Sequence, residues 1–151
     1  MKRVGLVSDT HGLLRPEVLD FLRGSDHIIH AGDICEPDVL DALRQLAPLT
    51  AVRGNNDAGP RAEALREQET LQVEGVRIHV IHDLSELPGR APPPGVHALV
   101  SGHSHKPKVE QREGTLWVNP GSAGPRRFKL PISAGELLVD GATVSARLVT
   151  F

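Results

Sequence analysis

The chain has few aromatic residues and a single cysteine. Its 151 residues include no tyrosine, one tryptophan and three phenylalanines, which are too few for the aromatic platform on which single-stranded nucleic acids stack. A net charge of −2 gives no overall field that would attract long nucleic acids or an anionic membrane. The lone Cys35 excludes an internal disulfide and is typical of a reducing compartment. We therefore expect neither a long nucleic acid nor a membrane as a partner.

Long apolar runs are also absent. No stretch approaches the roughly 20 residues of a membrane span. The basic start Met1-Lys2-Arg3 is followed by an apolar run, Val4 to Val7, that is too short for a signal peptide. We therefore expect a cytoplasmic protein. With 39% hydrophobic and 24% charged residues, the composition is ordinary for a globular protein, and we expect a single domain over residues 1–151.

The first half alternates predicted strands with predicted helices. Strand-like runs cover Val4–Val7, His27–His30 and Leu49–Val52. Between them, apolar residues at helical spacing predict helices from Pro16 to Gly24 and from Pro37 to Leu46. This order predicts parallel strand pairing with right-handed crossovers.

The second half has a different pattern. Ala62–Glu69 reads as a short helix, and Thr70–Glu74 with Val76–Ile81 as a hairpin. The other predicted strands are Ala98–Val100, Leu116–Val118 and a closing hairpin of Glu136–Val139 and Thr143–Val149 across Asp140-Gly141. Together these segments predict an α/β fold of two mixed β-sheets, packed face to face and flanked by helices.

Side chains that can bind metals follow five of these strands. Alternate residues share a side on an extended segment, so His103 and His105 can aim at one point. In α/β sheets, ligands bind outside the carboxyl ends of the strands. The donors found there are two carboxylates, one amide oxygen and four imidazoles: Asp9, His11, Asp33, Asn55, His82, His103 and His105. This set is too large for one tetrahedral zinc and suits two metals that share a bridging carboxylate.

Oxygen and nitrogen donors without thiolates argue against a structural zinc site. They are compatible with manganese, iron, cobalt, nickel or zinc and do not choose among these metals. Two other interpretations stay open at this point. His103 and His105 can be surface residues of a polar turn, or the chain can be a single-zinc hydrolase of another fold. The latter would leave Asn55 and one carboxylate without a role.

Five short motifs, in order along the chain, resemble the calcineurin-like metallophosphoesterases. They are Asp9-x-His11, Gly32-Asp33, Gly54-Asn55, His82 and Gly102-His103-x-His105. Three longer stretches are similar to the small bacterial and archaeal phosphodiesterases of that family, a subgroup that also includes the eukaryotic retromer subunit Vps29. They are Ser8-Asp9-Thr10-His11-Gly12, Val52-Arg53-Gly54-Asn55 and Asn119-Pro120-Gly121-Ser122. The resemblance extends from Val4 to about Phe128.

The resemblance implies a four-layer α/β/β/α sandwich with a dinuclear metal centre. The first metal would be held by Asp9, His11, Asp33 and His105. The second would be held by Asp33, Asn55, His82 and His103, with Asp33 bridging. The expected cofactors are two divalent transition-metal ions, first of all manganese, with iron, nickel, cobalt or zinc as alternatives.

Two such cations, about 3.5–4 Å apart, would convert a bridging water into a hydroxide that attacks phosphorus. We therefore expect a hydrolase of small phosphate esters, and a phosphodiesterase rather than a phosphomonoesterase. The residues expected to act in catalysis are Asp33, Asn55, Asn56 and His103, and those expected to contact the substrate are Arg53, Asn55 and Asn56. The alternative is a protein-interaction scaffold like Vps29 with an idle metal site. The sequence leaves open the physiological substrate and whether the chain forms a dimer or a tetramer.

Three features depart from the family pattern. Asn56 stands where relatives have His or Cys, and an amide cannot protonate a leaving alkoxide. This predicts slow turnover biased toward good leaving groups, unless Asn56 serves only to bind phosphate or cap its loop. Asp83 stands where relatives have Gly, and it either supports the metal site or caps a helix at Ser85. The run Pro92-Pro93-Pro94 replaces a helix of many relatives near the histidine pair.

Overall fold

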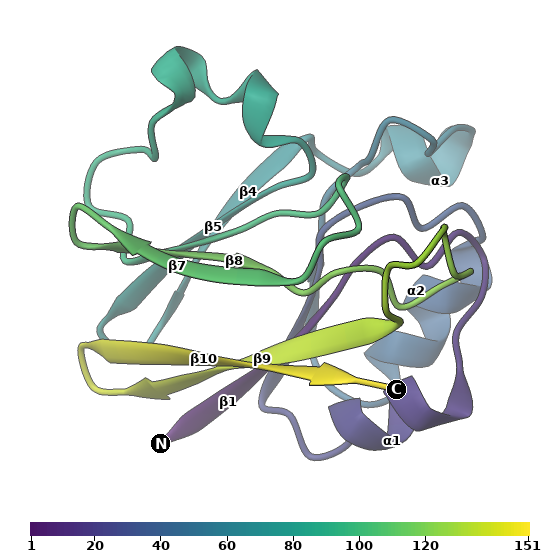
Figure 1. The fold of residues 1–151 in the computed structure, drawn as a ribbon, viewed down its shortest axis with the longest axis horizontal. Helices are drawn as coiled ribbons and strands as arrows, with labels where there is room; N and C mark the ends of the chain where they lie inside the picture. Colours follow the sequence, from purple (N-terminus) through teal and green to yellow (C-terminus); the bar gives the residue numbers. More distant parts are fainter.

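Ten strands form two five-stranded sheets in the computed structural model, which describes residues 1–151. The first sheet contains, in spatial order, β10 (Thr143–Thr150), β9 (Ser133–Asp140), β1 (Lys2–Val7), β2 (His27–His30) and β3 (Leu49–Ala51). The second contains β4 (Gln68–Val73), β5 (Val76–Ile81), β6 (Ala98–Val100), β8 (Thr115–Asn119) and β7 (Lys108–Arg112). The two sheets lie one over the other (Figure 1).

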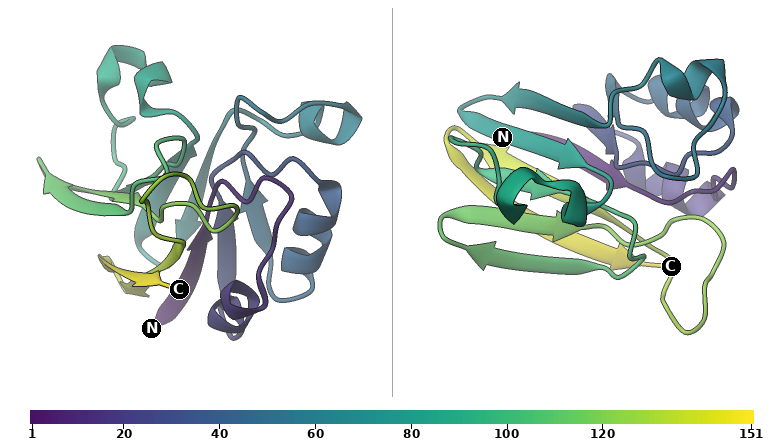
Figure 2. Two further views of the ribbon diagram at one scale, coloured as in Figure 1. Left: turned by 45° about the vertical axis from the view of Figure 1, so that its right-hand side comes forward. Right: turned by 90° about the horizontal axis from the view of Figure 1, so that it is seen from above.

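The strands β1, β2 and β3 pair in parallel, as the alternation of strands and helices predicted. The connecting helices are α1 (Pro16–Leu22) and α2 (Pro37–Arg44). Each begins with proline, whose missing N–H would have no partner in a first helical turn. Val18 and Leu43 of these helices belong to a buried cluster with Ile28 of the sheet. The helices therefore cover one face of the first sheet, and Figure 2 shows them together on one side of the molecule.

The main hydrophobic core lies between the two sheets. It includes Leu6, Ile29 and Leu137 from the first sheet. Ile78 and Val100 contribute from the second sheet. Burial of a side chain of this kind is worth about 1.5–3 kcal/mol, so the shared core fixes the position of one sheet relative to the other. It thereby sets where the loops of one sheet meet those of the other.

The outer face of the second sheet has only a thin cover. Two single-turn 3₁₀ helices, η1 (Leu84–Glu86) and η2 (Pro88–Arg90), lie there, and Leu87 packs against Ile81 and Leu99. Proline cannot supply the N–H that continues a helix, so the run Pro92-Pro93-Pro94 accounts for the absence of a longer one. The predicted fold class of two mixed sheets flanked by helices is confirmed, with this fourth layer reduced to two turns. None of the helices has the length and apolar character needed to cross a bilayer.

The predicted and observed elements differ in two places. The predicted helix Ala62–Glu69 is wrong, because α3 (Pro60–Glu63) has only four residues and β4 already begins at Gln68. Pairing of Gln68 with Ile81 draws this polar segment into the sheet, so tertiary pairing overrides local propensity. The second difference is β7, an edge strand that the sequence did not predict because its residues are mostly charged.

Candidate metal centre

The seven predicted metal ligands come together at one edge of the sandwich, the edge toward which β1 runs in Figure 1. Each sits in a loop directly after a strand. Asp9 and His11 follow β1, Asp33 follows β2, Asn55 follows β3, His82 follows β5, and His103 and His105 follow β6. All seven thus lie just after strand ends, and their function as ligands stays a prediction.

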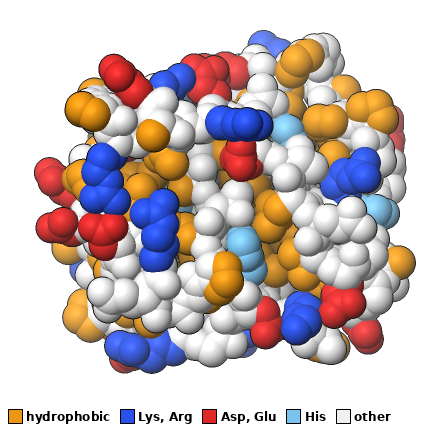
Figure 3. Space-filling view, turned by 180° about the vertical axis from the view of Figure 1, so that it is seen from behind, with side chains coloured by type: hydrophobic (Ala, Val, Ile, Leu, Met, Phe, Trp, Pro, Cys, Tyr) orange, Lys and Arg blue, Asp and Glu red, His pale blue; other side chains and the backbone are white.

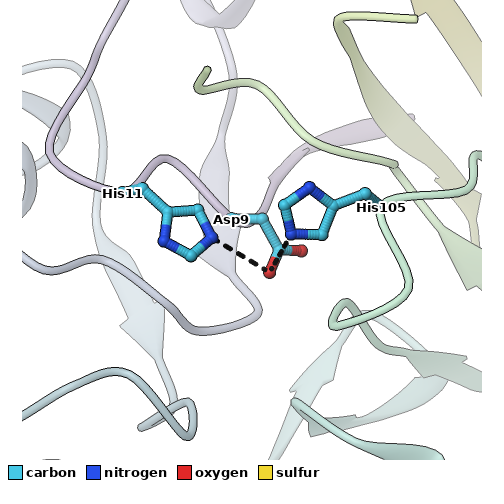
Figure 4. A group of neighbouring side chains, drawn as sticks. All are labelled: Asp9, His11 and His105. Carbon is cyan, nitrogen blue, oxygen red and sulfur yellow. Dashed lines mark ion pairs between the residues drawn. The ribbon is translucent and has the colours of Figure 1, made fainter. Parts of the chain in front are cut away.

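Asp9, His11 and His105 form the first group of donors (Figure 4). Asp9 Oδ1 lies 3.4 Å from His105 Nε2 and 4.0 Å from His11 Nε2. Asp9 Oδ1 and His11 Nε2 are buried and have no hydrogen-bond partner. A buried polar atom without a partner costs about 1–3 kcal/mol. Asp9 Oδ1 and His11 Nε2 face each other across a gap that one cation would fill, so the two atoms are suited to bind a metal.

Asp33 and His82 form the second group, together with Asp9. His82 Nε2 lies 3.4 Å from Asp33 Oδ2 and 3.8 Å from Asp9 Oδ1. The opposite ring nitrogen, Nδ1, donates a hydrogen bond to the carbonyl of Ala31 at 2.6 Å. Such a bond to backbone fixes the orientation of a metal-binding imidazole and leaves the other nitrogen for the metal. The donor chemistry of this group also fits a cation.

The charges of this second group depend on each other. Burial alone would lower the pKa of His82, but the hydrogen bond to Asp33 and the charges of Asp9 and Asp33 raise it. Burial alone would raise the pKa of Asp33, but hydrogen bonds from His82 and Asn56 hold it well below its usual range. A cation and a proton would therefore compete for His82 Nε2, and metal binding would release that proton.

Asn55 and His103 lie at the exposed rim of the site. Asn55 Oδ1 is 3.0 Å from His82 Nε2 and 3.1 Å from His103 Nδ1. Asp83 contacts both Ser85 and His103. Its Oδ1 accepts a hydrogen bond from the Ser85 amide at 3.0 Å, which confirms the cap, and its Oδ2 lies 3.7 Å from His103 Nε2. Asp83 thus caps η1 and places a negative charge near Nε2 of His103, the ring nitrogen opposite the one that faces Asn55.

Asn56 directs its hydrogen bonds at Asp33. Its backbone N–H donates to Asp33 Oδ1 at 2.9 Å, and its side-chain Nδ2 donates to Asp33 Oδ2 at 3.0 Å. Both oxygens of the proposed bridging carboxylate are therefore held by one residue. This contact was not among the alternatives that the sequence left open for Asn56.

Asp57 is a residue that the sequence analysis passed over. Its carboxylate accepts four backbone N–H groups, from Asp33 at 3.0 Å and from Ile34, Cys35 and Gly54 at 2.8 Å each. It thereby ties the loop after β2 to the loop after β3 and fixes the backbone that carries Asp33. An Asp in a Gly-Asn turn commonly accepts nearby backbone amides, and this was the available signal.

Two glycines beside the donors are required by close packing. A Cβ at Gly54 would lie 2.3 Å from the amide nitrogen of Asp33. A Cβ at Gly102 would lie 2.1 Å from Ser8 Oγ and 2.7 Å from Asp9 Oδ2. Any larger residue would push the loops that carry the two carboxylates apart.

The backbone of the site has unusual torsion angles. Five of the seven predicted ligands have left-handed φ values: Asp9 (54°), His11 (45°), Asp33 (58°), His103 (72°) and His105 (63°). Each such residue costs of order 1 kcal/mol or more. Backbone hydrogen bonds hold two of them, because Asp9 donates to the Gly32 carbonyl and His11 to the Asp33 carbonyl, both at 3.0 Å. Strain of this kind is characteristic of functional loops.

Arg53 and Cys35 border the site without joining the donor groups. The Arg53 guanidinium lies 3.0 Å from the Glu67 carboxylate, and its contact with a substrate stays a prediction. Cys35 Sγ lies 3.6 Å from His11 Nδ1. Burial and the nearby carboxylates raise the pKa of the thiol to about 11.

A buried imidazole beneath the site predicts a pH dependence of stability. His30 Nδ1 accepts a hydrogen bond from the Gly32 amide, Nε2 lies 3.0 Å from Thr10 Oγ1, and burial lowers the pKa of His30 to about 4. The unfolded chain binds this proton below about pH 6.5 and the folded chain does not. The stability that neutral His30 contributes to the fold is therefore fully present above about pH 6.5 and is lost as the pH falls toward 4. In chelator, the free energy of unfolding should lose about 2 kcal/mol from this group between about pH 7 and about pH 5. Urea unfolding of wild type and His30→Gln checks this, and an identical pH dependence in both would contradict it.

Comparisons with known proteins agree with this architecture. Residues 1–141 match the model of the calcineurin-like phosphoesterase superfamily domain. A protein of Methanothermobacter thermautotrophicus described as a probable metallophosphoesterase is 34% identical, over 97% of this chain and 91% of its own length. The structure of the phosphoesterase Yfce of E. coli is 26% identical, with a TM-score of 0.71 over 89% of this chain and 87% of that one. Chaetomium thermophilum Vps29 shares the fold, with a TM-score of 0.82 at 20% identity over 100% of this chain and 98% of that one.

Proposed function

Since this chain belongs to the calcineurin-like phosphoesterase superfamily, we propose that it is a metal-dependent hydrolase of small phosphate esters, and specifically a phosphodiesterase. The observation that carries this proposal is the convergence of buried oxygen and nitrogen atoms at one sheet edge. Asp9 Oδ1 and His11 Nε2 have no protein partner there. A protein-interaction scaffold with an idle metal site is the second candidate, and likeness of fold to Vps29 supports it. A scaffold alone gives no reason to bring carboxylates and imidazoles from separate loops so close together.

The donors divide into two proposed cation sites. One is Asp9, His11, Asp33 and His105, and the other is Asp33, Asn55, His82 and His103, with Asp33 common to both. Asp9 Oδ1 also lies within 4 Å of donors in both groups, at 3.4 Å from His105 and 3.8 Å from His82. Manganese is our first choice of metal, and iron, nickel, cobalt and zinc suit the same donors. When bound, two such cations supply Lewis acidity, which acidifies water and neutralises charge on the phosphoryl oxygens.

The rim residues of the chain would orient the substrate. Asn55 Oδ1 faces His82 and His103, so its Nδ2 is left to donate a hydrogen bond to a phosphoryl oxygen. His103, with 45% of its side chain exposed, lies where it can meet the ester. Asn56 holds Asp33 and has no proton to transfer. The leaving group must then depart with little help from the protein, which favours esters of acidic alcohols.

The substitution Asn56→His tests the role of this position. A histidine can protonate a leaving alkoxide, and general acid catalysis is typically worth 10²–10⁴-fold. Turnover of an alkyl phosphodiester should rise about 10²-fold, while turnover of an aryl phosphodiester should change little because a phenolate leaves without a proton. Steady-state kcat for the two substrate types is the measurement, with Asn56→Gln as the matched control. Equal gains on both substrates would contradict this account.

The charge of Asp83 should strengthen metal binding through His103. Asp83→Asn keeps an oxygen for the Ser85 amide but removes the negative charge that lies 3.7 Å from His103 Nε2. Loss of a carboxylate behind a metal-binding histidine lowers metal affinity by about 10–100-fold when the two are hydrogen-bonded. At this longer distance we expect Asp83→Asn to lower the manganese affinity about tenfold, in the weaker of two binding steps measured by calorimetry. Ser85→Ala, which affects only the cap, should leave both steps unchanged. The same loss in both variants would assign Asp83 to the cap alone.

An assay of the wild-type chain tests the proposed function directly. The protein is loaded in turn with Mn²⁺, Fe²⁺, Co²⁺, Ni²⁺ and Zn²⁺ and given bis(p-nitrophenyl) phosphate, p-nitrophenyl phosphate and cyclic nucleotides. We expect turnover of the diester to exceed that of the monoester. Two bound metals per chain without turnover of any ester would favour the scaffold.

A further inference from the structure

A small apolar hollow lies beside the proposed metal centre, between the start of α2 and α3. Its volume is about 130 Å³. Its apolar wall is formed by Ile34, Pro37, Leu40, Ala58, Ala62 and Leu65. Seen from behind, the side of the molecule that carries α2 and α3 shows apolar side chains set among charged ones (Figure 3). An apolar cavity of about 150 Å³ can hold benzene, so this hollow has room for about one six-membered ring.

Two residues of the hollow contact residues of the metal centre. Cys35 forms part of the wall, and its Sγ lies 3.6 Å from His11 Nδ1. Asp57 also lines the hollow, and its carboxylate accepts the amide of Asp33 at 3.0 Å. His11 thus lies between the metal centre and the hollow, because its Nε2 faces Asp9 and Asp33 while its Nδ1 faces Cys35.

The charges around the hollow do not suit a second anion. Arg61 is the cation of the wall, and its guanidinium is bound to the Asp41 carboxylate through contacts of 2.8 and 3.3 Å. The oxygens of Asp57 are occupied by backbone N–H groups. Glu36 adds a negative charge, which would repel a second phosphate. The chemistry of the hollow therefore matches an uncharged group.

We propose that this hollow binds the organic group of the phosphate ester, and that the preferred substrates carry an uncharged, apolar group of about one ring. This inference rests on the proposed function, since it places the phosphorus at the two cations. It selects aryl or compact alkyl phosphate esters over sugar phosphates and polyphosphates. Affinity would come from apolar area removed from water, which is worth about 25 cal/mol per Å².

Binding of two phosphonates to the manganese-loaded protein tests the proposal without relying on turnover. Phenylphosphonate and methylphosphonate present similar anions and differ in the organic group. Calorimetry on the wild type should give about tenfold tighter binding of phenylphosphonate. Ala62→Phe fills the hollow and should reduce this preference to about onefold, with the affinity for methylphosphonate unchanged. Ala62→Ser, of nearly unchanged size, should keep the preference.

Ala58 also lines the hollow, and Ala58→Phe replaces Ala62→Phe if that variant does not fold. Equal binding of both phosphonates by a wild type that hydrolyses esters would overturn this inference and leave the proposed function intact. A preference that survives in a folded filling variant would also overturn it, because the ring would then bind elsewhere. A wild type that binds neither phosphonate and hydrolyses no ester would refute the proposed function, and the inference with it.

Discussion

Asp33→Ala should strongly reduce hydrolysis of phosphate esters and remove at least one of the two proposed metals. Asp33 Oδ2 lies 3.4 Å from His82 Nε2 and 3.6 Å from His11 Nε2, so Asp33 stands between the two proposed sites. Loss of one electrostatic contact to the transition state costs about 10²–10³-fold, and a shared ligand affects two cations at once. We expect kcat/KM for an aryl phosphodiester to fall by about 10³-fold or more.

The measurements for Asp33→Ala are metal per chain by mass spectrometry after gel filtration, and kcat/KM with manganese in excess. Asp38→Ala serves as the matched control, because Asp38 is an acidic residue in the first turn of α2 and lies outside the donor groups. It should bind two metals and retain the wild-type rate. Two metals and an undiminished rate in Asp33→Ala would refute the proposed dinuclear site.

Asp57→Ala should cause a large loss of stability. The four backbone N–H groups that its carboxylate accepts would lose their protein partner. Hydrogen bonds to a charged group contribute about 1.5–3 kcal/mol each, and water can replace some of them where the loop is exposed. We expect the free energy of unfolding to fall by about 3 kcal/mol, which corresponds to a fall in Tm of about 10 °C.

Urea unfolding in chelator measures this loss apart from any effect of bound metal. Asp26→Ala is the control, because the Asp26 carboxylate accepts a single backbone N–H, from Arg3 at 2.9 Å. It should cost about 1 kcal/mol or less. Equal losses in the two variants would show that the four bonds of Asp57 act no more strongly than one. Metal affinity should also fall in Asp57→Ala, since Asp33 and Asn55 sit on the two loops that it joins.

The position of the site was predictable because it depends on local sequence. Each donor follows its strand directly, and parallel pairing of β1 with β2 and of β2 with β3 brings their carboxyl ends to one edge. Parallel pairing of β5 with β6 does the same for His82, His103 and His105, and the packing of the two sheets then brings the two sets of donors together.

Other features depend on how distant loops lie against each other. The bonds of Asp57 to Ile34 and Cys35 cross between the loops after β3 and β2. No pattern within either loop specifies how far apart the two loops lie. The charged strand β7 is defined by its pairing with β8 rather than by its own alternation. The hollow beside α3 required knowing that α3 ends at Glu63, whereas the sequence predicted a helix to Glu69.

The left-handed torsion angles of the five ligand positions have a consequence for the energetics of metal uptake. The backbone amides of Asp9 and His11 bond to carbonyls of the neighbouring loop, and the amide of His103 donates to Asp9 Oδ2 at 3.1 Å. The polypeptide itself thus holds these loops in their costly shape. The free energy needed to arrange the donors is therefore supplied by folding, and the donors are preorganised when an ion binds. Glycine adopts these angles freely, so the donor side chains are kept at these positions at a cost in backbone free energy.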